Sequence, residues 1–384
     1  MKIGIDAHGV GGHSLGPGNE TYFQNLIGAL LDIDSQNEYH IFVNHPESME
    51  NTVAGHSNAR LAPLWPHSQW IQRPVSVPLY ATRHNLDLVH VPFIRPPFMR
   101  AKTVLTVHDV NFEIYPQDFT LPVRWRLKTF VGSSIRKADV IFTVSEFGRQ
   151  QIHSVYGVPL EKIIVTYNAA DHLRFDGSKP TDRTAQHLAL PQRFLFFVGA
   201  IQPKKNLARL VRAFDRLISK SDIPHHLLIA GKWGWGNDDL SAALDQVIHR
   251  DRVRLLGYLT PGELVTTMRL ADAFTFPSLY ECFGIPPMEA QLAGIPALVS
   301  DTTCFPEIYR DSVLYCDPEN VDSIEAALRT LVSNPTLREE LAVKGLAQAR
   351  KFTWKRSAAV ALNAYKDVYS SRRVPIEGRL SCEN

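Results

Sequence analysis

The stretch of residues 276–300, FPSLYECFGIPPMEAQLAGIPALVS, constrains the fold more than any other part of the chain. Its first residues end an apolar run that is typical of a buried parallel strand. A loop follows, and Pro286 and Pro287 then fit the first turn of a helix, where missing N–H groups do no harm. Gly294 is a typical helix end, and Ile295 opens the next apolar run. This order of strand, loop, helix and strand predicts an α/β domain.

The same stretch carries two acids and a place suited to an anion. Backbone N–H groups and the dipole at a helix N-terminus favour negative charge. Because the two prolines lack N–H groups, the available amides are those of Phe283, Gly284 and Ile285. Glu281 precedes the helix and Glu289 lies on it, so we expect the two carboxylates to bind different parts of one ligand. Amides for a phosphate and acids for sugar and ribose hydroxyls together indicate a nucleotide-sugar.

Glu281 and Glu289, with seven residues between them and the pair Phe283–Gly284, resemble the double-glutamate motif of the retaining glycosyltransferases of family four, the glycosyl transferases group 1. The resemblance covers about residues 1–370 and implies the GT-B fold, in which two Rossmann-like α/β domains face each other across a cleft and a C-terminal helix crosses back to the first domain. The family usually has glycine where this chain has Cys282, which would be strained if that position required a positive φ. The alternative interpretation is a loop acid and a surface helical acid with no joint role.

Two lysines form a second signal. The segment GAIQPKKN, residues 199–206, lies between the apolar run FLFFV and a predicted helix, where cations can meet a diphosphate. It resembles the family's P-R-K-N or P-R-K-G signature, with Lys204 in place of the arginine and Lys205 in place of the lysine. The resemblance implies that Lys205 and Glu281 are catalytic and that Lys204 binds the donor, although a lysine cannot make the planar bidentate contact of an arginine. The alternative is a solvated lysine pair.

The N-terminal half carries weaker signals. Residues 2–7 read as a buried strand, followed by a glycine-rich loop and a helix, and the resemblance implies a substrate-binding role for Gly18 at the helix start. A simple flexible turn is the alternative, and the spacing does not match the dinucleotide fingerprint. Residues 103–109, TVLTVHD, read as a strand that ends in His108 at the sheet edge where α/β proteins bind ligands. The family has a histidine near the donor hexose, so we expect His108 to be catalytic, or else to cap the strand.

The resemblance also implies the domain organisation. The residues after the third strand of the second half bind the base through main-chain contacts in this family, and this role falls to Leu259. We expect an acceptor-side domain over residues 1–172, a linker over 173–192, a nucleotide-sugar-binding domain over 193–352, a crossover helix over 353–372 and a loose tail over 373–384.

Composition excludes several classes of protein. The chain has 384 residues and a net charge of +2, which gives no electrostatic case for binding nucleic acid. Its four cysteines lack zinc-ligand spacing, and we expect neither a metal site nor a cofactor. The start MKIGID reads as a strand rather than a signal peptide, and the apolar runs are too short to span a bilayer, so we expect a cytoplasmic protein. Residues 121–138 mix basic and aromatic residues, which indicates a solvated basic face or a peripheral contact with the inner face of a membrane.

These observations predict a metal-independent, retaining hexosyltransferase that moves a sugar from a nucleoside diphosphate to a hydroxyl of a polysaccharide or lipid-linked oligosaccharide precursor. UDP-glucose is the preferred donor, and GDP-mannose is the alternative. Three other classes remain open: a glycoside hydrolase that uses both acids, a non-catalytic nucleotide-sugar-binding protein and a Rossmann dehydrogenase. A hydrolase needs two carboxyl groups that flank one bond and leaves the lysine pair without a role.

Overall fold

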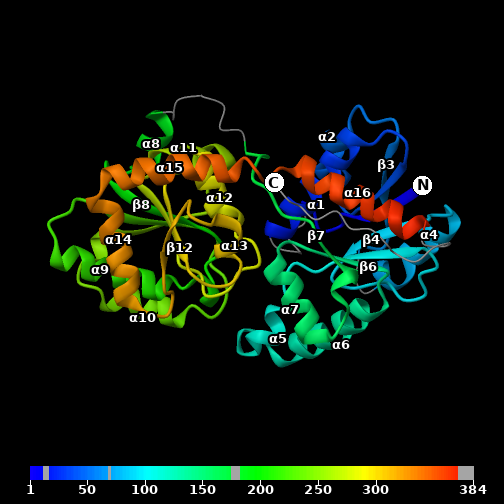
Figure 1. The fold of residues 1–384 in the computed structure, drawn as a ribbon, viewed down its shortest axis with the longest axis horizontal. Coiled ribbons are helices and arrows are strands. Elements are labelled where there is room, and N and C mark those ends of the chain that lie inside the picture. Colours follow the sequence, from blue (N-terminus) through cyan, green and yellow to red (C-terminus); the bar gives the residue numbers. More distant parts are fainter. Residues whose placement is uncertain (12–16, 68–70, 174–181, 371–384) are drawn as a thin grey trace. The chain divides into compact units, whose positions relative to one another are not determined.

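A computed structural model describes residues 1–11, 17–67, 71–173 and 182–370. The chain forms two compact units (Figure 1). The first unit contains Met1–Tyr167 and the chain from Trp354 onward, and the second contains Asn168–Thr353. The expected loose tail from residue 373, which includes Cys382, lies outside the described residues, as do residues 174–181 of the expected linker.

The first unit is built on a parallel sheet whose strands have the order β3-β2-β1-β4-β5-β6-β7. Its inner strands are almost entirely buried and rich in Ile, Val, Leu and Phe, as expected for a sheet that is covered on both faces, whereas the edge strands β3 and β7 are partly exposed. They are β1 (Lys2–Asp6), β2 (Glu38–Val43), β3 (Ala59–Pro63), β4 (Leu88–Pro92), β5 (Lys102–Thr106), β6 (Val140–Thr143) and β7 (Ile163–Val165).

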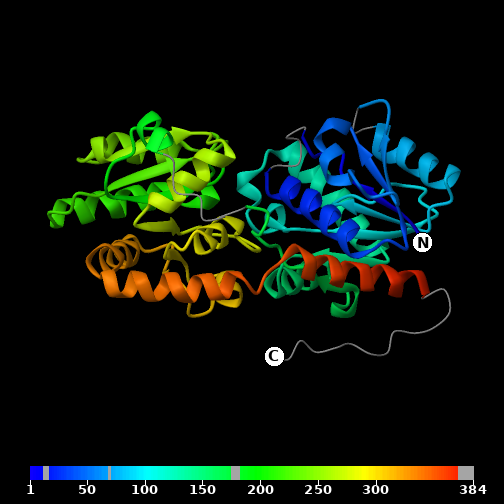
Figure 2. The ribbon, with the colours of Figure 1, turned by 90° about the horizontal axis from the view of Figure 1, so that it is seen from above.

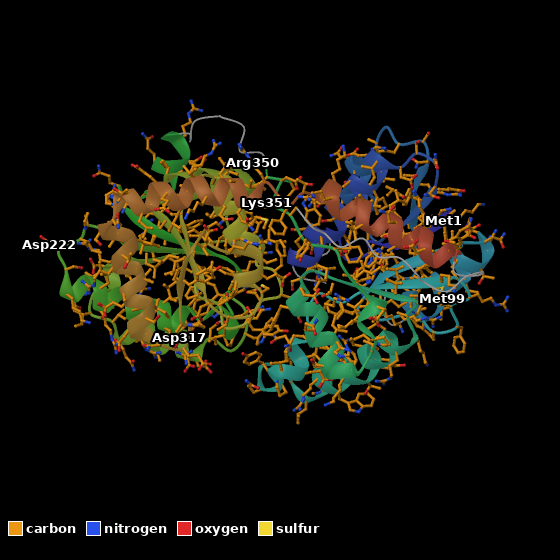
Figure 3. All side chains as sticks on the ribbon, viewed as in Figure 1. Met1, Met99, Asp222, Asp317, Arg350 and Lys351 are labelled. Atoms are coloured by element: carbon orange, nitrogen blue, oxygen red, sulfur yellow. The ribbon has the colours of Figure 1, made fainter. Side chains whose placement is uncertain are left out.

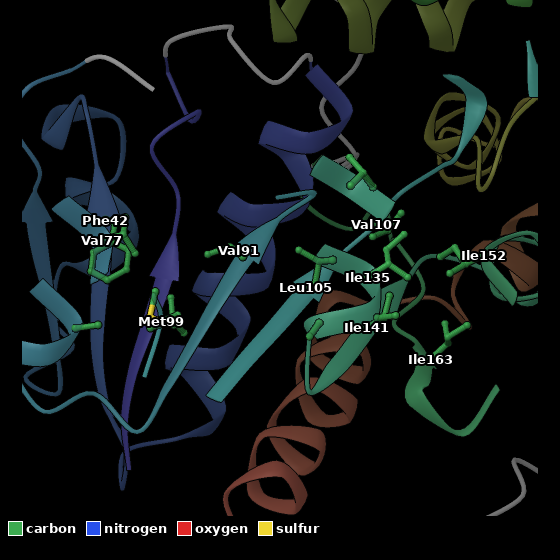
Figure 4. Packing of buried hydrophobic residues seen from close by; sticks show 14 of the residues in the cluster. Phe42, Val77, Val91, Met99, Leu105, Val107, Ile135, Ile141, Ile152 and Ile163 are labelled. Atoms are coloured by element: carbon green, nitrogen blue, oxygen red, sulfur yellow. The ribbon is translucent and has the colours of Figure 1, made fainter. Parts of the chain in front are cut away.

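Helices cover both faces of this sheet (Figures 1 and 2). One face carries an apolar cluster in which strand residues such as Val91 and Leu105 meet Val77, Ile135 and Ile152 from three helices (Figure 4). The helical segments of the unit are α1 (Pro17–Ile33), η1 (Pro46–Ser48), α2 (Glu50–Val53), η2 (Gln72–Ser76), α4 (Val77–Arg83), α5 (Asn111–Ile114), η3 (Pro116–Asp118), α6 (Leu121–Lys137), α7 (Glu146–Tyr156), η4 (Leu160–Lys162) and α16 (Trp354–Ser370).

The C-terminal helix α16 is part of the first unit, although the rest of that unit ends at Tyr167. It packs along α1 and contacts β5. Its Tyr365 is fully buried, and the hydroxyl lies 2.7 Å from Nδ1 of His90, whose Nε2 lies 2.6 Å from Oγ1 of Thr106. Because a buried imidazole requires partners for both nitrogens, this chain of hydrogen bonds fixes the helix to the sheet.

The second unit has a parallel sheet in the order β10-β9-β8-β11-β12-β13, and its side chains fill the space between sheet and helices (Figure 3). The strands are β8 (Phe194–Val198), β9 (His226–Ala230), β10 (Val253–Gly257), β11 (Ala273–Phe276), β12 (Ala297–Ser300) and β13 (Leu314–Cys316). The helical segments are α8 (Asp182–His187), η5 (Pro203–Lys205), α9 (Leu207–Lys220), α10 (Asp238–Gln246), η6 (Arg250–Arg252), α11 (Pro261–Leu270), α12 (Ile285–Leu292), α13 (Phe305–Tyr309), α14 (Val321–Ser333) and α15 (Pro335–Ala349).

The strand order places a topological switch between β8 and β11. The chain runs from β8 toward β9 and β10 on one side, whereas it runs from β11 toward β12 and β13 on the other. All neighbouring strands are parallel, so the loops that follow β8 and β11 leave the same edge next to each other. Ligands of open α/β sheets bind at such a point.

Two details differ from the sequence-based domain limits. The structure groups residues 168–172 with the second unit, whereas the sequence suggested that they end the first domain. The segment expected to be a structureless linker contains helix α8, which packs on α11. Among the described residues, none of the helices has both the length and the apolar character needed to cross a bilayer.

Candidate functional site

The strand ends of the second unit are joined by backbone hydrogen bonds. Gly199, after β8, donates its N–H to the carbonyl of Ala230 at 3.0 Å, and Gly231 donates to Gly257 at 2.8 Å. Gly231 has a φ of 144°, and a Cβ atom there would lie 1.8 Å from the carbonyl oxygen of Gly199. Only glycine therefore allows this approach, which brings the loops after three neighbouring strands together at one edge.

The lysine turn is tied to the loop after β11. Asn206 follows η5, lies in the left-handed region with φ 61°, and is buried. Its side-chain amide donates to the carbonyl of Pro277 at 2.9 Å and to that of Pro318 at 2.7 Å. The N–H of Leu279 donates to the carbonyl of Lys204 at 2.8 Å. These bonds position the two lysines against the loop that carries Glu281.

Lys205 and Glu281 form an ion pair in which both side chains are only 12% exposed. The Lys205 ammonium also lies 4.7 Å from the centre of the Phe276 ring. Burial alone would raise the pKa of Glu281, but the charges of Lys205 and Lys204 outweigh it and hold that pKa below its ordinary value. Glu281 is therefore a carboxylate at neutral pH. The structure brings together two residues to which the sequence assigned separate parts of a ligand.

Helix α12 begins as the sequence predicted, with Pro286 and Pro287 in its first turn. Gly284 precedes it with φ 78°, and a Cβ atom there would lie 2.6 Å from Cε1 of Phe305. Its carbonyl accepts a hydrogen bond from the buried Tyr309 hydroxyl. Ile285 is the first residue of the helix. The close contact with Phe305 makes glycine the only residue that fits at position 284.

The residues of the loop that precedes α12 are well packed. Phe283 is buried and makes an edge-to-face contact with Phe352, with ring centres 5.7 Å apart. Cys282 is buried, does not have a positive φ, and lies with Sγ 3.5 Å from the Tyr280 hydroxyl. The strain considered for a cysteine at this position is therefore absent.

Glu289 is buried in the middle of α12, with 8% of its surface exposed. Burial raises its pKa to about 7. Its Oε1 lies 3.6 Å from Nε2 of His172, which is too long for a hydrogen bond. Burial also lowers the pKa of His172 to about 4, so the imidazole is neutral at pH 7 and does not compensate the carboxylate. A ligand with hydroxyl donors would stabilise the ionised form.

The loops after β9 and β10 contribute a further cation and an aromatic ring. The Lys232 ammonium lies 5.2 Å from the centre of the Tyr258 ring, which is itself exposed. Leu259, the residue expected to hold a base through its main chain, directly follows Tyr258 in the sequence and is buried. Position 259 is thus at the same sheet edge as the lysine turn, at the end of the strand that joins β9.

The remaining residues expected in the site belong to the first unit. His108 follows β5, is 9% exposed and packs edge-to-face on Tyr22, with ring centres 4.7 Å apart. Burial lowers its pKa to about 3, and its Nε2 has no hydrogen-bond partner among the described residues. Gly18 lies in the first turn of α1, where nothing occupies the space that a Cβ would take.

Sequence reasoning missed a buried cluster in the first unit. Asp6 ends β1, and its carboxylate contacts Nδ1 of His8, whose Nε2 lies 3.0 Å from a guanidinium nitrogen of Arg73. Asp6 and His8 lie at the end of a strand that reads as buried, so the sequence could have indicated these two residues. Arg73 lies 65 residues farther along the chain than His8, and no local pattern links it to them. Within the described part of the chain, no group of His, Cys, Asp and Glu side chains is arranged to hold a metal ion.

Comparisons with known proteins agree with this architecture. Residues 18–174 match the family model described as Glycosyltransferase Family 4, and residues 178–347 match that of Glycosyl transferases group 1. O-antigen chain mannosyltransferase B of Escherichia coli is 30% identical over 294 residues, which cover 75% of this chain and 76% of that protein. O-antigen chain mannosyltransferase RfbU of Salmonella typhimurium is 28% identical over 320 residues, which cover 82% and 79% of the two chains.

Solved structures share the fold at low sequence identity. Sucrose-phosphate synthase from Thermosynechococcus elongatus matches with a TM-score of 0.75 and 18% identity, over 97% of this chain and 100% of that one. Anabaena HepE in complex with UDP and glucose matches with a TM-score of 0.72 and 16% identity, over 96% and 100% of the two chains. Together with the coverage of the mannosyltransferases, these matches show that the chain is a glycosyltransferase of family 4, glycosyl transferases group 1, with the GT-B fold.

Proposed function

We propose that the chain transfers a mannosyl group from GDP-mannose to a sugar hydroxyl of an O-antigen or related polysaccharide precursor, with retention of the anomeric configuration and without a metal ion. The two mannosyltransferases that cover most of this chain support mannose as the sugar. UDP-glucose, the donor preferred from the sequence, is the competing donor in the test below. The acceptor class follows the names of the same two relatives.

The observation that carries this proposal is the buried contact between Lys205 and Glu281 at the switch point of the second sheet. A donor pyrophosphate would bind Lys204, Lys205 and the amides of residues 283–285. The lysine charges would then stabilise the negative charge that grows on the leaving diphosphate. Glu281 would accept hydrogen bonds from hydroxyls of the transferred hexose.

The other expected residues receive roles that fit their surroundings. Glu289 would ionise on binding and accept hydrogen bonds from the ribose hydroxyls, and Leu259 would hold the base through its main chain. The neutral imidazole of His108 would donate a hydrogen bond to a hexose hydroxyl, because burial keeps it uncharged. Gly18 would leave space for substrate at the start of α1. The leaving diphosphate would accept the proton of the acceptor hydroxyl, so that the reaction needs no protein base.

Helix α6 supports a peripheral location at the inner face of a membrane, with the rest of the protein in the cytoplasm. Its side chains Leu121 and Trp125 are 78% and 68% exposed, and Phe130 is also exposed. Arg124 and Lys128 lie on the same helix. Exposed aromatic and aliphatic side chains among basic residues are typical of helices that lie on an anionic bilayer.

The test of donor and catalytic role uses the full chain and three lysine variants. GDP should raise the melting temperature more than UDP, and GDP-mannose should release GDP when acceptor is added. K205M should lower kcat by a factor on the order of 10²–10³ at saturating donor, because it removes charge stabilisation at the leaving group. K204M should raise KM for the donor more than it lowers kcat.

K344M is the matched control, since Lys344 is a surface lysine paired with Asp311 and Glu340. It should leave turnover unchanged. A near-normal kcat of K205M at saturating GDP-mannose would contradict the proposed role. A preference for UDP over GDP in the melting experiment would replace mannose by the competing donor, and tight nucleotide binding without turnover would indicate a non-catalytic binding protein.

A further inference from the structure

A buried tyrosine contacts the start of helix α12 and has no role in the chemistry described above. Tyr309 ends α13, is 0% exposed, and donates a hydrogen bond from its hydroxyl to the carbonyl oxygen of Gly284. Burial raises the pKa of this hydroxyl well above its usual value, so the hydroxyl keeps its proton and remains a donor. Gly284 directly precedes Ile285, the first residue of α12. The tyrosine therefore acts on the turn that leads into the helix.

The planar peptide unit between Gly284 and Ile285 transmits this hydrogen bond. It is a trans peptide, in which the carbonyl oxygen and the amide hydrogen point in opposite directions. A bond that fixes the direction of the Gly284 carbonyl therefore also fixes the direction of the Ile285 N–H. Because the N–H groups of a first helical turn have no acceptor within the helix, the N–H of Ile285 points out of the N-terminus of α12.

This peptide unit joins two residues whose backbone conformations are locally unfavourable. Gly284 has φ 78° and ψ 72°, in a region that side chains other than glycine rarely adopt. Ile285 is helical although it precedes Pro286, and a proline ring disfavours the helical conformation of the residue before it. The local sequence therefore favours other orientations of the peptide unit, and the hydrogen bond from Tyr309 opposes them.

The position of Tyr309 is itself fixed by hydrogen bonds to α12. Its carbonyl accepts from the Ser312 hydroxyl at 2.6 Å and from the Ser312 N–H at 3.0 Å. The Ser312 hydroxyl in turn accepts from the side-chain amide of Gln291, a buried residue of α12, at 2.7 Å. A chain of hydrogen bonds thus leaves α12 at Gln291 and returns to it at Gly284 through the side chain of Tyr309. The hydroxyl is held by the same helix whose first peptide unit it orients.

A row of aromatic rings connects Tyr309 with the lysine turn. The centre of the Tyr309 ring lies 5.8 Å from that of Phe305, and the Phe305 ring makes an edge-to-face contact with Phe276 at 6.2 Å. The Lys205 ammonium lies 4.7 Å from the centre of the Phe276 ring. The row therefore supports two groups with a proposed role in diphosphate binding, the ammonium of Lys205 and, through Tyr309, the N–H of Ile285.

We propose that Tyr309 is a positioning residue for the donor: its hydroxyl orients the Ile285 N–H toward the diphosphate. This inference rests on the proposed function, which assigns the donor diphosphate to the amides ahead of α12, and it adds the residue that holds one of them. Tyr309 acts through the peptide unit and not by contact with the substrate. An amide that is already oriented stabilises phosphate charge without reorganisation, whereas a free peptide unit must first turn.

The test compares Y309F with the matched control Y315F in the full chain. Both changes keep the aromatic ring and remove one hydroxyl, so both proteins should fold. The Tyr315 hydroxyl donates to the carbonyls of Arg310 at 2.6 Å and Phe305 at 3.4 Å, neither of which belongs to α12. In the turnover assay of the proposed function, Y309F should lower kcat roughly tenfold, because one preorganised donor is lost. Y315F should leave kcat unchanged.

The affinities of GDP and guanosine separate positioning from a general loss of structure. Y309F should weaken GDP binding several-fold and leave guanosine binding unchanged, because guanosine carries no phosphate to meet the Ile285 N–H. Y315F should bind both ligands like the wild type. If Y309F weakens both ligands by the same factor, or neither of them, the proposed role of Tyr309 is overturned.

The Ile285 amide can also be observed directly by nuclear magnetic resonance in protein with isotope-labelled isoleucine, with I285V to assign its signal. GDP should shift this signal in the wild type and in Y315F, and guanosine should leave it in place. In Y309F the shift with GDP should fall to less than half. An equal shift in all three proteins would show that the amide keeps its orientation without the hydroxyl.

The outcomes separate this inference from the proposed function. If the wild type binds GDP and Y309F binds it equally well, Tyr309 has no positioning role and the donor site stands. If UDP binds in place of GDP, the mannosyl donor is replaced, and UDP and uridine provide the same comparison. If the wild type binds neither nucleotide, the proposed function fails, and the role of Tyr309 fails with it.

Discussion

At the scale of single residues, the burial of the Glu289 carboxyl group reduces the stability of the folded chain at neutral and higher pH. Burial raises its pKa from the ordinary 4.5 to about 7. Between these two pH values the folded chain binds the proton more tightly than the unfolded chain does, so the free energy of unfolding falls as pH rises. The stabilising contribution of the protonated acid is complete below pH 4.5 and is lost as pH rises through about 7.

E289Q should therefore be more stable than the wild type at high pH, because glutamine mimics the protonated acid. The expected gain at pH 8 is about 3 kcal/mol, and at pH 5 the two proteins should differ little. Urea unfolding at both pH values measures the difference. E319Q, which changes an exposed acid, is the matched control. A gain that is the same at pH 5 and pH 8 would show that the ionisation of Glu289 is not its origin.

Gly284 and Gly294 allow backbone strain to be separated from steric contact. Both have φ 78°, but a Cβ at position 284 would lie 2.6 Å from the Phe305 ring, whereas nothing lies within 4 Å at position 294. G294A should lower the free energy of unfolding by roughly 1 kcal/mol through backbone strain. G284A should cost about 1–3 kcal/mol more, because the ring must also move. Equal losses in urea unfolding would refute the contact with Phe305.

The sequence predicted the elements that carry the proposed site residues, but not the contacts between those residues. The acids at 281 and 289 and the lysines at 204 and 205 could be identified because each lies in a local pattern around a strand end. Their direct contact could not, since it depends on the order of the strands. Arg73 was missed for the same reason: its link to β1 is a contact between distant segments.

At the scale of elements, the turn between β8 and α9 depends on Asn206. Its left-handed backbone disfavours side chains other than Asn and Gly, and its amide satisfies two carbonyl groups. N206G should relieve the backbone but leave the carbonyls of Pro277 and Pro318 without this donor, at a cost of roughly 1–3 kcal/mol. N206A should cost about 1 kcal/mol more, because alanine is strained at φ 61°.

Urea unfolding gives the stabilities, and GDP binding under the proposed function gives the effect on the lysine turn. Both variants should weaken nucleotide binding, because the position of Lys204 and Lys205 depends on this residue. If N206A were as stable as N206G, the conformation of the turn would not depend on a left-handed residue. Normal nucleotide affinity in both would show that the tie to Pro277 does not position the lysines.

Most elements could be predicted from periodicity, because buried parallel strands read as continuous apolar runs. The strand Phe194–Val198 coincides with the apolar run FLFFV that the sequence shows. Helix α8 was missed, because five polar residues and one alanine carry no amphipathic pattern. The short helical turns between residues 46 and 83 and strand β3 are too brief to give a periodic signal.

At the scale of the whole molecule, the chain leaves the first unit at Tyr167 and returns to it at Trp354. The sequence-based limit at residue 172 was five residues later, because an apolar run marks a strand but does not show which unit its following loop contacts. The return of the C-terminal helix came only from the family resemblance. The contacts of α16 now give that return a physical basis.

A chain that ends at Thr353 should therefore lose the first unit and keep the second. Without α16, buried His90 loses the Tyr365 hydroxyl, Tyr22 loses its contact with Trp354, and the apolar face of α1 is exposed to water. Y365F is the mild counterpart: it removes one hydroxyl, should cost about 1–3 kcal/mol and should leave both units folded.

Thermal unfolding of the truncated chain should show one cooperative transition, with far-UV circular dichroism reduced by more than α16 itself accounts for. Under the proposed function the residues that bind the donor nucleotide belong to the second unit, so the truncated chain should still bind GDP. A truncated chain with an intact first unit would show that α16 only lies on that unit and does not stabilise it.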